Sequence, residues 1–205
     1  MRLPATVCAV LREGPDVAWP DESSRPRVTD PAEARHGHPN QELLVQVHAH
    51  LRGELTRIAE ALDQLVGTVG TGTRDADVGD IRAFVHRMTN RQNAFSVGAF
   101  CAAYCRTVAT HHAIEDLRMF PDLAVAEPAL VPVVDRLEAE HLVIAGMLDA
   151  LDRALVAMVA GAHQRADDVR RVREAAERLA DALGSHLDYE EQQLLGPLGR
   201  LPIVI

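Results

Sequence analysis

Four segments of this chain carry apolar residues at steps of three and four, and this spacing constrains the fold more than any other feature. The segments are residues 41–66, 78–119, 130–159 and 165–195. Apolar residues at this spacing line one face of a helix. Strand patterns are almost absent, so we predict an all-α fold, an up-down-up-down four-helix bundle with an N-terminal extended arm.

Proline and glycine set the expected limits of the bundle. Residues 1–40 contain six prolines, a density that no helix tolerates, and we expect an arm that lies across the bundle, adds a strand or forms a disordered tail. We expect Gly67 to end the first helix, Pro121 the second and Pro197 the fourth, with a break near 90–93 as an open alternative. The expected organisation is an arm over 1–40, a bundle over 41–198 and a tail over 199–205.

Charge and composition exclude several classes of partner. The formal net charge is −9 and only seven of 205 residues are aromatic, which disfavours nucleic acid, because neither phosphate attraction nor base stacking is provided for. No apolar run is long enough to cross a membrane. The three cysteines are too few and odd in number for a disulfide framework. We therefore expect a soluble, cytoplasmic protein.

Imidazoles and carboxylates interrupt the apolar faces of the helices. His111 and Glu115 are four residues apart in the second segment, and His186 and Glu190 repeat that spacing in the fourth. Residues four apart lie within about 40° of each other around a helix, so both members of each pair can face the bundle interior. Such groups are difficult to bury unless a cation neutralises the carboxylates.

The two pairs belong to what looks like an internal duplication. Residues 111–123 can be laid over 186–198 without a gap, and His48 and His141 are single histidines within the apolar stripes of the first and third segments. Each half therefore supplies two histidines and one carboxylate. Two such sets suit two adjacent iron ions with open coordination positions, and carboxylates can bridge the pair.

These residues resemble the motifs of the hemerythrin-like family, also called the HHE cation-binding domain, over residues 41–198. The motifs are His48 in His-Ala-His-Leu-Arg, His111 to Asp116 as His-His-Ala-Ile-Glu-Asp, His141 in Glu-Ala-Glu-His, and His186 to Glu191 as His-Leu-Asp-Tyr-Glu-Glu. The resemblance implies a four-helix bundle with a non-haem di-iron centre. It further implies binding of, or reaction with, dioxygen, peroxide or nitric oxide, or sensing of iron or oxygen.

The chain departs from the oxygen-carrying members of that family. Those carry two histidines four apart on the third helix, whereas Leu137 and Ala145 flank His141 at that spacing. The carriers also place the last carboxylate five residues after its histidine, which would be Glu191, while helical geometry favours Glu190. A site with fewer ligands is more open, so we expect chemistry on a bound small molecule rather than reversible oxygen carriage.

Two residues could replace the missing ligand. His112 lies about 60° around the helix from Glu115 and is either a ligand or a hydrogen-bond donor beside the site. Glu138, three residues before His141, is the second candidate, although we expect it at a solvated helix edge.

Neighbouring residues have less specific expectations. Asp116 and Glu191 are expected to face solvent or adjacent helices. Tyr104 lies two turns before His111 and could hydrogen-bond to the site, but core packing with its hydroxyl bonded elsewhere is the favoured alternative. Cys101 and Cys105 are expected as small buried side chains. Arg52 is expected as a surface partner or a partner of a ligand, and His36, His38, His50 and His163 are expected to be exposed.

The function predicted from these observations is that of a non-haem di-iron protein. We expect metal ligation by His48, His111, His112, Glu115, His141, His186 and Glu190. The cofactor is two iron ions, with zinc or another divalent metal as an alternative. The leading hypothesis is an oxidoreductase acting on dioxygen, peroxide or nitric oxide. The alternative is a module that senses or stores iron or oxygen without turnover.

Overall fold

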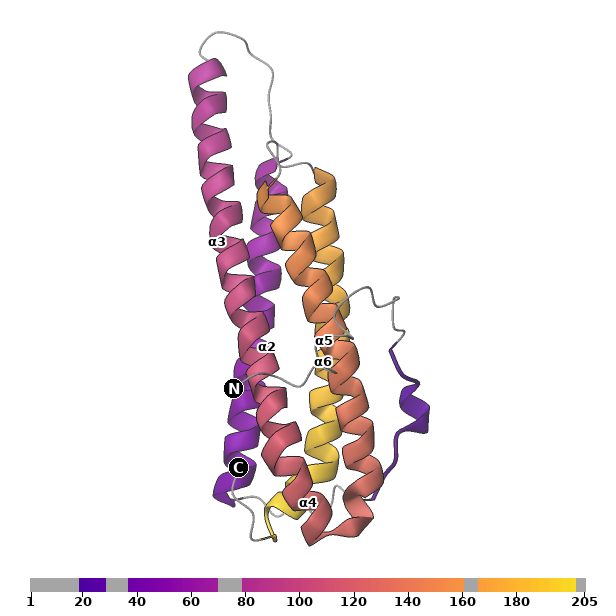
Figure 1. Ribbon diagram of the computed structural model, residues 1–205. Coiled ribbons are helices and arrows are strands. Elements are labelled where there is room, and N and C mark those ends of the chain that lie inside the picture. The colour runs from indigo at the N-terminus through magenta and orange to yellow at the C-terminus, as the bar shows by residue number, and fades with distance from the viewer. Residues whose placement is uncertain (1–18, 29–36, 70–78, 161–165, 202–205) are drawn as a thin grey trace.

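The computed structural model describes residues 19–28, 37–69, 79–160 and 166–201. Side chains are described throughout these ranges except at 64–69, 79–95 and 166. Its long helices are α2 (Pro39–Val69), α3 (Gly79–Ile114), α5 (Val131–Ala160) and α6 (Ala166–Leu198). They lie lengthwise beside one another as a bundle (Figure 1). Both α2 and α5 contact α3 and α6, so α2 lies diagonally across from α5. The predicted four-helix bundle is confirmed, and the described residues contain no strand.

Several predicted helix limits were wrong. The chain stays helical past Pro121, through a π-helical turn named η3 (Glu115–Met119) into the short helix α4 (Phe120–Ala126), and a 3₁₀ turn named η4 (Pro128–Leu130) then leads to α5. Pro121 is in the first turn of α4, where a missing N–H costs nothing. The backbone of α3 is unbroken at 90–93, Gly67 lies inside α2, and α6 includes Pro197 in its last turn.

A histidine of the arm caps the first helix. The backbone N–H of His38 donates to Gln41 Oε1 at 3.1 Å, and the N–H of Asn40 donates to His38 Nδ1 at 3.3 Å. This reciprocal arrangement satisfies N–H groups that a helix start leaves unpaired. His38 is half-buried rather than exposed as predicted, while His50 is exposed as expected. His36 and His163 lie outside the described residues.

Two apolar cores occupy different levels of the bundle. The larger one contains Leu51, Val108, Ile144 and Leu183 and is contributed by all four long helices. The smaller one lies near α4 and contains Phe120, Leu130 and Leu194. In sequence, the buried histidines and glutamates fall between the two sets along α2, along α3 with its continuation, and along α5, while on α6 His186 and Glu190 lie where the two sets meet, beside Leu187 and Tyr189. The fold therefore isolates a buried polar layer between two apolar ones.

The described part of the arm lies against the bundle. It contains a 3₁₀ turn, η1 (Glu22–Ser24), and its hydrogen bonds reach α5 and α6. Figure 1 shows this segment in indigo beside those helices. The apolar stretch 7–11 of the arm lies outside the described residues. Within the described helices, none is both long enough and apolar enough to cross a membrane.

Candidate metal centre

Seven side chains predicted as ligands converge in the polar layer. Six are buried, and His111 is 11% exposed at its side chain. They form two groups, and in each group one ligand atom from every residue lies within 4.8 Å of those of the other members. We call the first the carboxylate cluster (His48, His111, Glu115, Glu190) and the second the three-histidine cluster (His112, His141, His186).

The carboxylate cluster combines residues of α2, η3, α3 and α6. His111 Nε2 lies 3.0 Å from Glu115 Oε1, and His48 Nε2 lies 3.5 Å from Glu190 Oε2. The predicted pairing of residues four apart therefore holds for His111 and Glu115. The rings of His48 and His111 meet edge to face, with centroids 5.2 Å apart.

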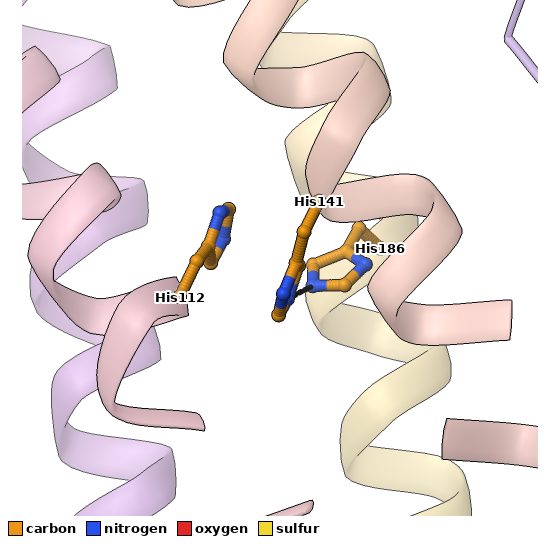
Figure 2. Close-up of side chains that lie close together, drawn as sticks. All are labelled: His112, His141 and His186. Carbon is orange, nitrogen blue, oxygen red and sulfur yellow. Dashed lines mark hydrogen bonds between the residues drawn. The ribbon is translucent and has the colours of Figure 1, made fainter. Parts of the chain in front are cut away.

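The three-histidine cluster gathers one side chain from each of α3, α5 and α6. The ring of His112 stacks on that of His141 with centroids 3.9 Å apart, and the Nε2 atoms of His141 and His186 are 3.0 Å apart. Figure 2 shows His112 extending from one side of the bundle toward the other two rings. The chain thus places His112, and not Glu138, in this group, since Glu138 is exposed.

Both glutamates lie between the clusters. Glu115 directs Oε1 to His111 and Oε2 to His141, the latter at 3.5 Å. Glu190 Oε2 is 3.5 Å from His48 Nε2 and 3.8 Å from His186 Nε2. Each carboxylate therefore faces one histidine of each cluster, which is the placement that a bridging group needs.

Three further carboxylates fix the orientation of three of the histidines. They accept hydrogen bonds from the Nδ1 atoms: Asp116 Oδ1 from His141 at 2.7 Å, Glu191 Oε1 from His48 at 2.9 Å and Glu140 Oε2 from His186 at 3.1 Å. An ionised carboxylate only accepts hydrogen bonds, so each Nδ1 carries the hydrogen and each Nε2 presents a lone pair to the clusters. The Nε2 lone pairs of His141 and His186 then face each other, an arrangement that a shared cation would stabilise.

Sequence reasoning placed Asp116 and Glu191 in solvent or against neighbouring helices and did not single out Glu140. Asp116 lies four residues after His112 and therefore shares the helix face of that histidine, at the start of the π turn in which the Phe120 N–H donates to Glu115 O. Glu191 is joined to Arg52 Nη1 at 2.8 Å, which makes Arg52 the partner of a carboxylate that holds His48. The sequence signal that could have identified Glu140 as a residue near the site is its position directly before His141.

Seven buried side-chain atoms have no hydrogen-bond partner among the described residues. They are Nε2 of His48, His111 and His112 and both carboxylate oxygens of Glu115 and Glu190. Buried polar atoms are almost always paired, and all seven belong to the two clusters. The unpaired atoms are lone-pair donors of the kinds that bind Fe²⁺ or Zn²⁺, so the residues fit a metal centre.

Burial shifts the protonation of these groups. It lowers the pKa of His111 to about 4 and that of His186 to about 3. For His186, burial outweighs the hydrogen bond to Glu140, which raises the pKa. Burial also raises the pKa of Glu115 and of Glu190 well above the usual range, and for Glu190 the neighbouring charge of Glu115 adds to the effect. Neutral imidazoles are ready to bind a cation, whereas the carboxylates need one to become ionised.

Comparison with known proteins agrees with this geometry. The sequence model described as "Hemerythrin HHE cation binding domain" matches residues 40–198. The chain belongs to the hemerythrin HHE family. No protein with a curated description and no solved structure gives a significant match.

The HHE domain of this chain differs from the oxygen carriers in how its third long helix contributes. Leu137 is fully buried in apolar surroundings and Ala145 is half-buried, so neither position of α5 offers a ligand atom. His112 occupies the three-histidine cluster instead. On α6 it is Glu190 that faces the carboxylate cluster, as helical geometry predicted. Glu191 instead bonds to Nδ1 of His48.

Tyr104 and the cysteines of the HHE domain pack in the core. The hydroxyl of Tyr104 donates to the carbonyl of Leu51 at 3.2 Å, so it is bonded elsewhere and not directed into the clusters. Burial raises the pKa of the Cys101 thiol to about 12 and that of the Cys105 thiol to about 11, which leaves neither thiolate available at neutral pH. The favoured alternative is therefore confirmed for Tyr104 and Cys101, whereas Cys105 is half-buried and packs against the core.

Proposed function

We propose that the HHE domain of this chain holds two iron ions and binds and reacts with a small oxidant: dioxygen, peroxide or nitric oxide. The carboxylate cluster would hold one ion and the three-histidine cluster the other, with Glu115 and Glu190 between them. Seven unpaired buried atoms in these two clusters carry the proposal, because a bound cation can accept several of these lone pairs at once. Zinc is the alternative metal for the same ligand types.

Iron bound here would supply a redox-active Lewis acid to a small ligand. The protein's own contribution is to hold each imidazole in one tautomer and orientation through Asp116, Glu140 and Glu191. Apolar side chains exclude water from both sides of the buried polar layer. The ring of Phe120 stacks on that of His141, with ring centroids 5.5 Å apart. These contacts keep the ligand atoms fixed and the surroundings dry.

The two clusters would share Glu115 and Glu190, so they differ in their histidines: two in the carboxylate cluster and three in the three-histidine cluster. We infer that the small molecule binds on the carboxylate side, because fewer protein ligands there would leave more room for it.

A second candidate function is sensing of iron or oxygen without turnover. The contact between the arm and the centre, through Arg25 and Glu140, favours it, since a sensor needs a segment that responds to the state of the site. The two functions share the metal centre and differ in turnover.

Metal analysis and a visible spectrum of anaerobically purified protein test the proposal. We expect two irons per chain, a near-ultraviolet or visible absorption that changes when peroxide or nitric oxide is added, and consumption of the added oxidant. The Glu115→Gln, Glu190→Gln double variant should lose the metal, while Glu60→Gln, a change at an exposed residue of α2, should retain it. Iron bound without oxidant consumption would favour the sensor, and failure to bind iron after reconstitution would refute the metal centre.

A further inference from the structure

Arg25, in the arm, reaches the buried carboxylate behind the three-histidine cluster. Its Nε donates to Glu140 Oε1 at 2.8 Å and its Nη2 donates to Glu140 Oε2 at 3.0 Å. The Arg25 side chain is only 8% exposed and Glu140 is fully buried. Glu140 Oε2 in turn accepts from His186 Nδ1 at 3.1 Å. A chain of hydrogen bonds therefore links a residue 115 positions before Glu140 to a proposed ligand.

We propose that Arg25 is a positioning residue for His186, and that docking of the arm is coupled to cation binding in the three-histidine cluster. This inference rests on the proposed metal centre and adds a role for the arm. Its first support is the fork geometry, because a guanidinium that contacts both oxygens fixes the plane of a carboxylate. The carboxylate plane then fixes the ring of His186.

The neighbouring arginine cannot replace this contact. Arg136 Nε donates to Glu140 Oε1 at 2.7 Å. Its other two nitrogens donate to the arm, Nη1 to Ser24 Oγ at 3.2 Å and Nη2 to the carbonyl of Asp21 at 2.9 Å. Of the two arginines, only Arg25 donates to Oε2, the oxygen that faces His186. Without it, Glu140 would keep a counter-charge but lose the contact that holds Oε2 toward the ring.

The arm is fastened around Arg25 by several independent contacts. The guanidinium lies 4.8 Å from the ring centre of Tyr189 and 5.7 Å from that of Trp19. Tyr189 Oη donates to the carbonyl of Pro26 at 2.7 Å, and Arg25 Nη1 donates to Ser185 Oγ at 2.9 Å. Residues on either side of His186 thus hold the segment that supports His186, so docking and positioning are one structural unit.

The carboxylate cluster has a comparable support that does not involve the arm. Glu191 bonds to His48 Nδ1, and Arg52, which shares α2 with His48, donates to Glu191. The same chain of arginine, carboxylate and histidine is therefore internal to the bundle on one side and supplied by the arm on the other. Loss of the arm contact should affect one cation and spare the other.

The coupling works in both directions. If docking favours the ion by holding His186, a bound ion must favour docking by the same factor. Replacing a residue that supports a metal ligand in this way typically weakens metal binding about 10- to 100-fold. We expect that range for the three-histidine cluster in an Arg25→Gln variant.

Titration of the metal-free protein with Co²⁺, followed by visible absorption, tests the proposal. Wild type should take up two ions. Arg25→Gln should weaken one binding step about 10- to 100-fold and leave the other unchanged, and Arg25→Lys, which keeps the charge without the fork, should give a smaller loss. Arg27→Gln, which removes an exposed arginine of the same arm, is the matched control and should behave as wild type.

Cleavage of the 27–28 peptide bond by trypsin gives a second readout. Mass spectrometry should show that Co²⁺ slows this cleavage in wild type and slows it far less in Arg25→Gln. If wild type binds two ions and Arg25→Gln binds both with unchanged affinity, the coupling is refuted while the metal centre stands. If wild type binds no ion, the metal centre itself is refuted. Should Arg25→Gln fail to fold, Arg25→Lys carries the same comparison.

Discussion

We expect Glu190 to lower the free energy of unfolding of the metal-free protein at neutral pH. Replacing Glu190 should therefore raise that free energy. The carboxylate is fully buried, both oxygens lack a hydrogen-bond partner among the described residues, and its pKa is raised well above 4.5 by burial and then by Glu115. In the unfolded chain the group ionises near its ordinary pKa of about 4.5. A group whose pKa is higher in the folded state than in the unfolded state contributes its full stabilisation of the fold at pH values below the unfolded pKa. That contribution is lost as the pH rises.

The size of the effect follows from the pH interval. Each pH unit between the unfolded pKa and the folded one costs about 1.4 kcal/mol. From pH 4.5 to pH 7 the loss is therefore at most about 3 kcal/mol. Glu190→Gln carries no ionisable group, so the metal-free variant should be more stable than wild type by up to this amount at pH 7. For a chain of this length the melting temperature would rise by up to about 6 to 12 °C.

Thermal unfolding at pH 5 and pH 7, with and without Fe²⁺ under anaerobic conditions, measures this. The difference between variant and wild type should shrink to below about 1 kcal/mol at pH 5. Excess metal should stabilise wild type, by about 3 kcal/mol per site at 100 times the dissociation constant, and stabilise the variant less, because the variant lacks one carboxylate of the centre, so the difference in stability should narrow. Glu60→Gln controls for the loss of a charge. A metal-free variant that melts below wild type at pH 7 would refute the reasoning, because it would mean that His48 already compensates the carboxylate.

Three other substitutions or treatments separate the roles assigned to individual side chains. His112→Ala should lower the bound metal from two equivalents to one, whereas His50→Ala, at an exposed position of the same bundle, should retain both; equal metal content by elemental analysis would remove His112 from the site. Tyr104→Phe should cost about 0.5 to 1.5 kcal/mol of unfolding free energy, because the hydrogen bond to Leu51 is lost, with no change in the spectrum of the metal-loaded protein; an altered spectrum would place the hydroxyl at the centre. Cys101 should resist iodoacetamide at pH 7 in the native protein and react after denaturation, and rapid native labelling would contradict its burial.

The positions of the helices could be predicted from the sequence because apolar periodicity and burial have the same cause. The histidines could be recognised for a related reason, since His48 and His141 lie within stripes that are otherwise apolar, where a polar residue needs an explanation. The helix end at Pro121 could not be predicted well. A proline there is compatible with a new helix starting directly after the π turn, and nothing in the local sequence distinguishes that start from an end.

The groups that support the histidines were harder to predict than the histidines themselves. Asp116 was misplaced because it was judged from its neighbour Glu115, although its spacing of four residues from His112 puts it on the face that meets His141. Glu191 lies at the edge between α6 and α2, where a small change in direction separates solvent from His48. Arg25 contacts a residue 115 positions away from a segment without any periodicity, so no sequence pattern relates the two.

The bond between Glu191 and His48 also has a consequence for how the chain folds. It joins residues 143 positions apart, and closing a loop of that length costs on the order of 4 kcal/mol in chain entropy. A contact of this kind forms after more local ones have reduced the cost. The carboxylate cluster needs α2 and α6 together, so it is completed only when the first and last long helices have met. A cation that binds there acts after the folding barrier, and its stabilisation should appear as slower unfolding rather than faster folding.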